Sequence, residues 1–422
     1  MQEKNIDFLS FGCRLNTLEA EKIKAMLINA GAGRAIIVNT CAVTAEAERQ
    51  SRQAVRKLSR ENPGVPLFIT GCAATRARED YEKIPGVAAV VANKDKFNID
   101  AYLEGTAASS LGKRELISAR HDTNSLIPFP SSLSKAFVQI QNGCNHSCAY
   151  CIVSKLRGKN VPFPYEKILG EVQSAADTGF FEVVLTGVDI AGYRMGQETL
   201  PDLCAALLRD VPKLQRLRLS SLDPGVNLRP IIDIMHENPR LLSHMHLSMQ
   251  SGSDKILAAM GRRHNVQMVR ELVKYVSLVT CHLSPVTFSW DIICGFPGET
   301  QELFEETCAL VRELKPIHVH VFPYSKRPGT LAATMPNQVD KAESKRRVRI
   351  INKLAKENRR QFMQTQIGKT VQVLMEENNI GRTPDDIPVK LQGAAIPAKT
   401  VLNLKLTAVD DGPELIYACV NF

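Results

Sequence analysis

The sequence predicts an α/β protein in three parts, and three patterns along its 422 residues carry that prediction. In residues 1–103, apolar runs alternate with helical repeats, which is typical of a doubly wound parallel sheet. Between residues 135 and 365, six strand signals again alternate with helical ones, too few for a closed barrel of eight units. From residue 366 the apolar period changes to two, which predicts a small all-β barrel. Residues 104–134, rich in Ser, Thr, Ala, Gly and Pro, are expected to form a linker.

Three predicted strands of the first region are each followed by a cysteine. The helices are expected at 17–30 and, after a capping Thr44, at about 45–60. Ligands of parallel sheets gather outside the carboxyl ends of the strands, so the three thiols are expected to form one iron–sulfur site. The alternative for each cysteine is a small, buried apolar side chain. The strands are expected at 6–12, 35–40, 67–71 and 87–91, and the cysteines are Cys13, Cys41 and Cys72.

Three more cysteines, in a C-x3-C-x2-C spacing, follow the first predicted strand of the central region: Cys144, Cys148 and Cys151. Thiolates at this spacing on a loop can each hold one iron of a [4Fe–4S] cluster and leave the fourth iron open. An open position is typical of a metal site that performs chemistry. The alternative is a zinc site closed by a distant ligand such as His146, although no second C-x2-C pair stands nearby.

Polar residues follow several strands of the central region. Glycine and serine at such places often only form turns, so each one alone is a weak signal for a ligand site. The candidates are Thr186, Gly187, Ser220, Ser221 and Gln250. The helices are expected at 166–178, 266–279 and 302–314, the last capped by Thr300. The strands are expected at 137–141, 181–186, 216–220, 244–249, 287–294 and 317–323.

Composition indicates a globular protein of a reducing compartment. Apolar residues make up 44% of the chain, and no run of about 18 apolar residues could span a membrane. The N-terminus lacks the layout of a signal peptide. The 11 cysteines form no dense extracellular framework. We therefore expect a cytoplasmic protein with no membrane partner. The cysteines outside the two trios are expected to be structural: Cys204, Cys281, Cys294, Cys308 and Cys419.

The net charge of +9 indicates a polyanionic partner, and basic residues are concentrated at 340–360. That segment predicts a helix with Val348, Ile351 and Leu354 toward a core and a basic outer face, which could equally be a solvated surface. The following all-β region is expected to have strands at 370–375, 386–391, 400–406 and 415–420. Small barrels of this kind often bind RNA. Because acidic residues outnumber basic ones in it, the electrostatic contact with RNA is expected through the basic helix.

Together the three regions resemble the radical S-adenosylmethionine (SAM) methylthiotransferases. The resemblance rests on Phe11-Gly12-Cys13-Arg14-Leu15-Asn16, Asn39-Thr40-Cys41-Ala42-Val43-Thr44, Gly71-Cys72, the Cys144/Cys148/Cys151 motif and Gln250-Ser251-Gly252-Ser253. The six central units suit the open, partial (β/α)6 barrel of radical SAM proteins, and the tail resembles a TRAM domain. Within the family, 39–44 and His320-Val321-Phe322-Pro323-Tyr324-Ser325 are most similar to the subgroup that methylthiolates N(6)-threonylcarbamoyladenosine at tRNA position 37.

The resemblance implies two [4Fe–4S] clusters and SAM as cofactors. Cys144, Cys148 and Cys151 would hold the cluster that cleaves SAM to a radical, and Cys13, Cys41 and Cys72 the cluster that carries sulfur. Family membership also implies the anticodon arm of tRNA as substrate, an electron donor such as flavodoxin or ferredoxin, and a sulfur donor. No side chain is assigned as a general acid or base. The implied SAM contacts are Tyr150, Thr186, Gly187, Ser220, Ser221 and Gln250.

The resemblance divides the chain into a methylthiotransferase domain at 1–103, the linker at 104–134, a radical SAM domain at 135–365 and a TRAM-like domain at 366–422. Two other classes of function stay open. One is a related radical SAM enzyme acting on isopentenyladenosine in tRNA or on a ribosomal protein. The other is a non-catalytic RNA-binding or redox-sensing protein with iron–sulfur clusters.

Overall fold

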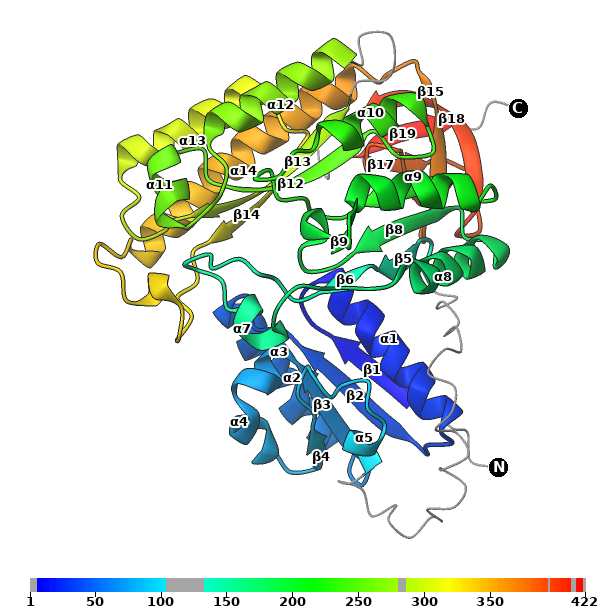
Figure 1. Cartoon of the computed structure of the whole chain (residues 1–422), viewed down its shortest axis with the longest axis vertical. Coiled ribbons are helices and arrows are strands. Elements are labelled where there is room, and N and C mark those ends of the chain that lie inside the picture. The colour runs from blue at the N-terminus through cyan, green and yellow to red at the C-terminus, as the bar shows by residue number, and fades with distance from the viewer. Residues whose placement is uncertain (1–5, 104–132, 280–285, 394, 411–414, 420–422) are drawn as a thin grey trace. The chain divides into compact units, whose positions relative to one another are not determined.

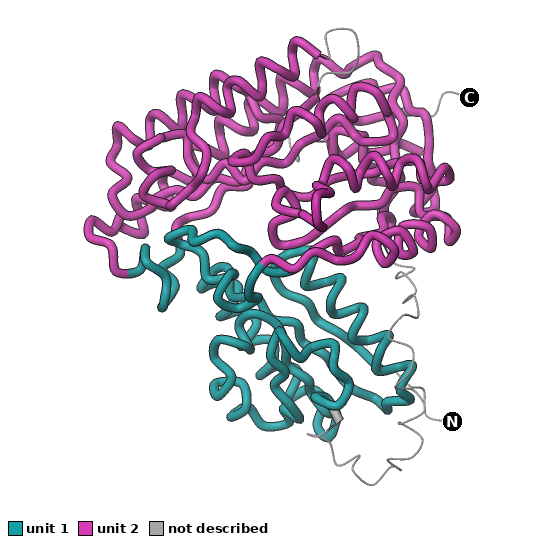
Figure 2. Tube along the Cα trace, in the orientation of Figure 1, with its two compact units in different colours: residues 1–130, 142–159, 325–333 teal, residues 131–141, 160–324, 334–422 magenta. Residues whose placement is uncertain are grey.

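A computed structural model describes residues 6–103, 133–279, 286–393, 395–410 and 415–419 (Figure 1). The predicted linker at 104–134 therefore lies almost wholly outside the described residues, as does Cys281. The chain forms two compact units (Figure 2). Unit 1 comprises Met1–Pro130, Asn142–Lys159 and Ser325–Ala333, and unit 2 comprises Ser131–Gln141, Asn160–Tyr324 and Thr334–Phe422.

Unit 1 is built on a four-stranded parallel sheet in the order β1-β2-β3-β4. Successive side chains of a strand point to opposite faces, and both faces of β2 and β3 are buried because helices cover both. Ile37 and Phe68 lie in the core on the side of α1 and α5, whereas Val38 and Ile69 lie in the core on the side of α2, α3 and α4. The predicted doubly wound sheet is confirmed. The elements are β1 (Ile6–Ser10), α1 (Arg14–Asn29), β2 (Ala35–Thr40), α2 (Ala45–Glu61), β3 (Leu67–Gly71), α3 (Cys72–Arg76), α4 (Arg78–Glu82), β4 (Val87–Val90) and α5 (Asp100–Leu103).

Two later segments of the chain complete unit 1. The first, Asn142–Lys159, carries the C-x3-C-x2-C motif and the short helix α7 (Val153–Arg157). Ile152 and Leu156 from this segment join the core between the sheet and α2 to α4. The second segment contains η4 (Leu331–Ala333), and the Ala332 amide donates to the Ala149 carbonyl at 2.8 Å.

Ahead of its C-terminal barrel, the described part of unit 2 has six strands that pair in parallel. They are β5 (Ala136–Gln139), β8 (Glu182–Thr186), β11 (Arg216–Leu219), β12 (His244–Gln250), β13 (Thr287–Cys294) and β14 (His318–Pro323). Ladders join β5, β8 and β11, and likewise β12, β13 and β14. Bridges Leu217–Leu241 and Leu222–Leu247 link the two groups. Six neighbouring parallel strands with helices between them form the expected open, partial (β/α)6 barrel.

Helices cover the outer face of this barrel (Figure 1). Thr300 caps α13 as predicted, because its hydroxyl accepts the Leu303 amide at 3.4 Å. The helices are α8 (Tyr165–Asp177), α9 (Leu200–Asp210), α10 (Arg229–Glu237), α11 (Asp254–Ala259), α12 (Val266–Val279), α13 (Gln301–Leu314) and α14 (Lys341–Gln364). The short elements are β6 (Gln141–Asn142), β7 (Val161–Pro162), η3 (Ile190–Gly192), β9 (Arg194–Met195) and β10 (Glu198–Thr199).

The inward face predicted for α14 was wrong in part. Ile351 is buried as expected, but Val348 and Leu354 are only half-buried. Two arginines of the same helix, Arg347 and Arg359, are buried instead. Arg347 donates to the carbonyl of Glu299 at 2.7 Å and to its carboxylate at 2.8 Å. Buried partners of this kind, invisible in the local pattern, stabilise arginines on the inner face.

The C-terminal region is a closed five-stranded barrel in the order β15-β16-β17-β19-β18, which confirms the predicted all-β barrel. Charged residues near the N-terminal ends of β5, β8 and β11 connect it to the rest of unit 2. Glu182 binds Arg218 at 2.5 Å and Lys135 at 3.4 Å, and Lys135 binds Asp386 of the small barrel at 3.2 Å. Burial opposes ionisation of Glu182, but these cations hold its pKa at about 2. The strands are β15 (Thr370–Met375), β16 (Ile380–Arg382), which was not predicted, β17 (Pro388–Leu391), β18 (Val401–Val409) and β19 (Ile416–Cys419).

Candidate metal centres and strand-end sites

The three cysteines of the N-terminal sheet lie at neighbouring strand ends. Thr40 pairs with Gly71 across the parallel ladder, so Cys41 and Cys72 follow β2 and β3 at the same level. Cys13 follows β1 after Gly12, which has a φ of +90°. A Cβ at Gly12 would collide with the Cys41 thiol, so only glycine allows the Cys13 turn to lie this close to Cys41. The structure therefore brings the first predicted trio together.

Side-chain amides and hydroxyls hold these three strand ends in place. The Asn16 amide donates to the carbonyls of Phe11 at 2.8 Å and of Thr40 at 3.1 Å. Asn39 donates to the Asn16 carbonyl at 2.7 Å. The Thr40 hydroxyl donates to the Thr70 carbonyl at 2.7 Å and accepts the first-turn amide of α3 at 2.9 Å. These hydrogen bonds hold the thiol-bearing loops together.

A buried charge network lies beside this trio. Arg157 of α7 donates to the Glu19 carboxylate at 2.7 and 3.0 Å and to Asn16 at 2.7 Å, and Lys96 also pairs with Glu19. Burial tends to raise the pKa of Glu19, but Lys96 and Arg157 outweigh burial and hold it below its usual value. Two cations paired with one carboxylate leave a net positive charge beside the trio. A positive charge of this kind stabilises anionic thiolates.

Cys41 and Cys72 are buried, whereas Cys13 is exposed. Burial raises the pKa of Cys41 to about 11. The Asn93 amide donates to the Cys72 sulfur at 3.4 Å. Thiols with a raised pKa lose their protons only when a metal cation binds, so metal binding here would release protons. Three thiols beside two cations fit three corners of a [4Fe–4S] cluster.

The second trio lies on a loop whose two ends are hydrogen-bonded to each other. Gly143 has a φ of +73°, and a Cβ there would collide with the Lys159 carbonyl. The Cys144 amide donates to the Gly158 carbonyl at 3.0 Å, and the Cys151 amide donates to the Cys148 carbonyl at 3.0 Å. All three cysteines and Tyr150 are partly accessible.

Backbone amides also point at two sulfurs of this loop. The His146 amide donates to the Cys144 sulfur and the Val153 amide to the Cys151 sulfur, both at 3.4 Å. Amide donors stabilise negative charge on cluster thiolates. The donor set of three partly accessible thiols therefore fits a [4Fe–4S] cluster with one open iron.

The remaining predicted residues lie at the carboxyl ends of three barrel strands in unit 2. Thr186 ends β8, and a Cβ at Gly187 would collide with the Gln141 amide oxygen, which also accepts the Asp189 amide at 2.9 Å. Gln250 ends β12 with a φ of +68°, a left-handed conformation rare for a residue with a side chain. Such strain is often retained at binding sites. Ser220 and Ser221 directly follow β11, between these two strands.

Sequence reasoning missed a polar cluster inside the (β/α)6 sheet. His246 of β12, Asp291 of β13 and His320 of β14 place a ligand atom each within 4.8 Å of one another. We call these three residues the lumen triad. Polar residues at every second position of otherwise apolar strands, as in His244-Met245-His246 and His318-Val319-His320, were the signal that could have found it.

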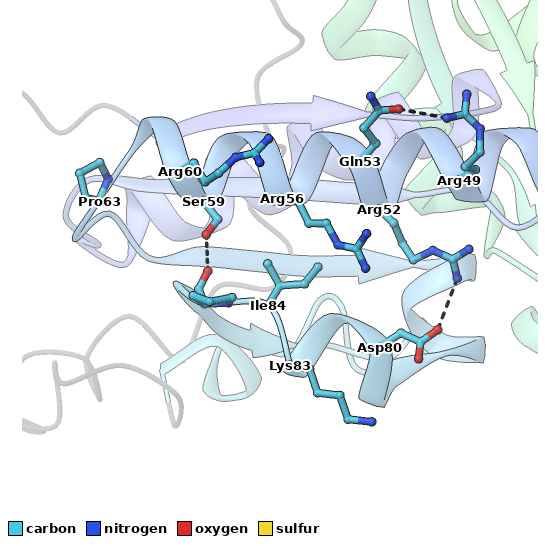
Figure 3. Close-up of a pocket in the computed structure, with 11 residues that line it drawn as sticks. Arg49, Arg52, Gln53, Arg56, Ser59, Arg60, Pro63, Asp80, Lys83 and Ile84 are labelled. Carbon is cyan, nitrogen blue, oxygen red and sulfur yellow. Dashed lines mark hydrogen bonds and ion pairs between the residues drawn. The ribbon is translucent and has the colours of Figure 1, made fainter.

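Unit 1 also carries an arginine-lined groove of about 1180 Å³ beside α2 (Figure 3). Arg49 pairs with Glu46 at 2.6 Å, and Arg52 with Asp80 at 3.4 Å. Arg56 and Arg60, one helical turn apart, have no ion-pair partner among the described residues. Figure 3 shows Arg56 extending toward Ile84 and Lys83. Arg56 and Arg60, one helical turn apart, therefore make the groove a candidate site for an anionic ligand.

Comparison with known proteins defines the class. Residues 138–311 match the model of the radical SAM superfamily, and residues 5–92 match that of the uncharacterized protein family UPF0004. A radical SAM methyltransferase, TsrM from Kitasatospora setae, shares the fold with a TM-score of 0.57 at 13% identity, covering 78% of this chain and 77% of its own. Among the described helices, none is long and apolar enough to cross a membrane. The chain is a radical SAM enzyme.

Its relatives define the family. The threonylcarbamoyladenosine tRNA methylthiotransferase MtaB of Rickettsia prowazekii is 36% identical over 409 residues, 96% of each chain. The protein of the same name in Bacillus subtilis is 30% identical over 88% of this chain and 85% of its own. A tRNA-2-methylthio-N(6)-dimethylallyladenosine synthase of Neisseria gonorrhoeae is 30% identical over 92% of this chain and 91% of its own. The chain belongs to the radical SAM tRNA methylthiotransferase family.

Proposed function

We propose that this enzyme inserts a methylthio group at C-2 of N(6)-threonylcarbamoyladenosine at position 37 of tRNA. The observation that carries the proposal is the 36% identity, across 96% of both chains, to a relative named for this nucleoside. The second candidate substrate is N(6)-dimethylallyladenosine, which the 30% identity to the Neisseria enzyme favours. The two nucleosides differ only in the substituent on N6, so the same chemistry at C-2 serves both.

The chemistry explains the need for two metal centres. Position 2 of adenine is an unactivated C–H bond that acid–base side chains cannot attack, and a SAM-loaded cluster supplies a carbon radical that can. Cys144, Cys148 and Cys151 would hold that cluster, and Cys13, Cys41 and Cys72 would hold a second one that provides sulfur. Tyr150 would flank the first cluster. We assign SAM to the strand ends of unit 2, with Thr186, Gly187, Ser220, Ser221 and Gln250 as its contacts.

Each unit carries a basic surface, and such surfaces support binding of tRNA. Seven Lys and Arg side chains of α14 are exposed on one long helix: Lys341, Lys345, Arg346, Arg349, Lys353, Lys356 and Arg360. Arg56 and Arg60 of the α2 groove add two cations one helical turn apart that are available to RNA phosphates. The target adenine must leave its stack in the RNA to reach a buried reaction centre. Contacts between these cations and the phosphate backbone would hold the RNA while it does so.

Anaerobic reconstitution tests the proposal. The wild type should bind about eight irons per chain, two clusters of four, and cleave SAM on reduction. Cys148→Ala should bind about four irons and lose SAM cleavage, whereas Cys41→Ala should bind about four and retain it but insert no sulfur. Cys204→Ala, which removes a buried thiol of α9, is the control and should keep about eight.

Substrate choice is tested with synthetic anticodon stem-loops that carry either nucleoside. The enzyme should methylthiolate the threonylcarbamoyl stem-loop at the higher kcat/KM, as measured by mass spectrometry of the nucleosides with a supplied electron donor and sulfur donor. Preference for the dimethylallyl stem-loop would reject the proposed substrate while keeping the enzyme class. About four irons in the wild type would reject the second cluster.

A further inference from the structure

Polar side chains line one face of the β12-β13-β14 sheet. His244 bonds to Ser289 at 3.0 Å and His246 to Asp291 at 3.0 Å, so these pairs share a face. The alternate residues, such as Leu247 and Trp290, are fully buried. In a barrel whose helices cover the outside, the buried apolar face lies against the helices and the polar face lines the lumen. The lumen triad therefore faces the interior of the barrel.

A chain of hydrogen bonds sets the proton positions in the triad. Arg359 of α14 can only donate, so His318 must accept at Nδ1, where the two nitrogens are 2.8 Å apart. Burial and the neighbouring His320 and Arg359 lower the pKa of His318 to about 4, so its ring is neutral at pH 7 and carries its proton on Nε2. That proton points to Nδ1 of His320 at 3.3 Å. His320 must then carry its own proton on Nε2.

The other two members are oriented as well. His246 Nε2 lies 3.0 Å from one oxygen of Asp291, and Ser221 donates to the other oxygen at 3.4 Å. The rings of His246 and His320 stack at 5.2 Å. The side chains of His246 and Asp291 remain 20% and 24% exposed, and His320 is exposed. The triad thus combines a fixed N–H donor with a carboxylate acceptor on an accessible surface.

We propose that the lumen triad recognises the polar substituent on N6 of the target adenosine, with His320 as the specificity-determining residue. This inference rests on the proposed function. A threonylcarbamoyl group carries a carboxylate and a carbonyl, which accept from the N–H of His320, and a hydroxyl, which donates to Asp291. A dimethylallyl group has no polar atom, so it would form no hydrogen bond with the triad. Sites built to hydrogen-bond a substrate reject analogues that lack the polar atoms.

Two histidines and a carboxylate could also bind a divalent metal. The proton positions argue against it. A metal needs a nitrogen lone pair, but Nδ1 of His320 accepts from His318 and its Nε2 carries a proton. The proton on Nε2 of His320 opposes metal binding, and it is the hydrogen-bond donor that the carboxylate of a threonylcarbamoyl group needs.

The test compares His320→Phe with the wild-type holoenzyme on the two stem-loops. Loss of a hydrogen bond to a charged group should lower kcat/KM for the threonylcarbamoyl stem-loop about 10²-fold, without lowering that for the dimethylallyl one. His320→Gln, whose amide can mimic the Nε2 donor, should recover most of the loss. His236→Phe, an exposed histidine of α10, is the matched control and should match the wild type. SAM cleavage without RNA should be unchanged in all variants, because neither His320 nor His236 is among the residues assigned to SAM.

The outcomes separate the two proposals. If the wild type prefers the threonylcarbamoyl stem-loop and His320→Phe keeps the same preference, this inference fails and the proposed function stands. If the wild type prefers the dimethylallyl stem-loop, both fail. Loss of SAM cleavage in both His320 variants would also overturn the inference, since it would show a structural role. So would a non-cluster metal ion that the wild type binds and His320→Phe loses.

Discussion

Replacing Glu19 by Gln should destabilise unit 1 and release the segment that carries the C-x3-C-x2-C motif. Glu19, Lys96 and Arg157 have 0%, 0% and 2% of their side-chain surface exposed. Glutamine keeps the shape of the side chain but leaves two buried cations without a counter-charge. Removing one partner from a buried ion pair costs about 3–5 kcal/mol. The network also anchors α7 to α1, so opening of this segment should become easier.

Hydrogen exchange measures this effect where it occurs. The single tryptophan, Trp290, lies in unit 2, so its fluorescence would not report on unit 1. A loss of about 3–5 kcal/mol corresponds to a fall in amide protection of roughly 10²-fold to a few thousandfold in α1 and α7. Glu61→Gln, which breaks an exposed 3.8 Å pair with Lys57, is the control and should cost less than about 1 kcal/mol.

The pH dependence gives a second readout. The folded-state pKa of Glu19 lies below its usual value, so its stabilising charge is present above the unfolded-state pKa and is lost as the pH falls. Glu19→Gln should lack this contribution at every pH. Equal amide protection in Glu19→Gln and Glu61→Gln near neutral pH would refute the reasoning, because it would show that the buried network adds no stability.

Three more outcomes are expected. Glu182 has a folded-state pKa of about 2, so unit 2 should lose stability as the pH falls from about 4.5 toward 2, and acid denaturation of Glu182→Gln should depend less on pH over that range. Gly12→Ala would place a methyl group on the Cys41 sulfur in a left-handed turn, so iron content should fall from about eight to about four with SAM cleavage retained; full iron would contradict the proposed site. Arg56→Gln with Arg60→Gln should weaken tRNA binding and reduce the slope of log Kd against log salt by about 1–2, whereas an unchanged slope would remove the α2 groove from the RNA surface.

Much of the fold could be predicted from the sequence because its signals are local. The strands of the N-terminal sheet are short and largely apolar, and helices begin at recognisable caps such as Thr44 and Thr300. The C-x3-C-x2-C spacing needs only one loop to place its thiols. Even Cys13, Cys41 and Cys72, far apart in the chain, could be grouped because parallel strands in register end at one edge of a sheet.

Other features depend on partners that no local pattern reveals. α14 buries Arg347 and Arg359 because Glu299 and His318, from distant elements, accept hydrogen bonds from them. Asn142–Lys159 groups with the N-terminal sheet because Ile152 and Leu156 find their apolar neighbours there. A charged side chain is buried only where opposite charges or acceptors surround it, and those surroundings exist only after folding.

The sequence by itself therefore determined the class of chemistry, because thiol spacing and strand ends follow from short-range geometry. Only the tertiary structure decided how the sites are supported and what lines the barrel. The lumen triad takes one residue from each of three strands, and the network of Glu19, Lys96 and Arg157 joins three separate segments. Long-range juxtaposition of this kind depends on the packing of the whole unit, which no single stretch of sequence encodes.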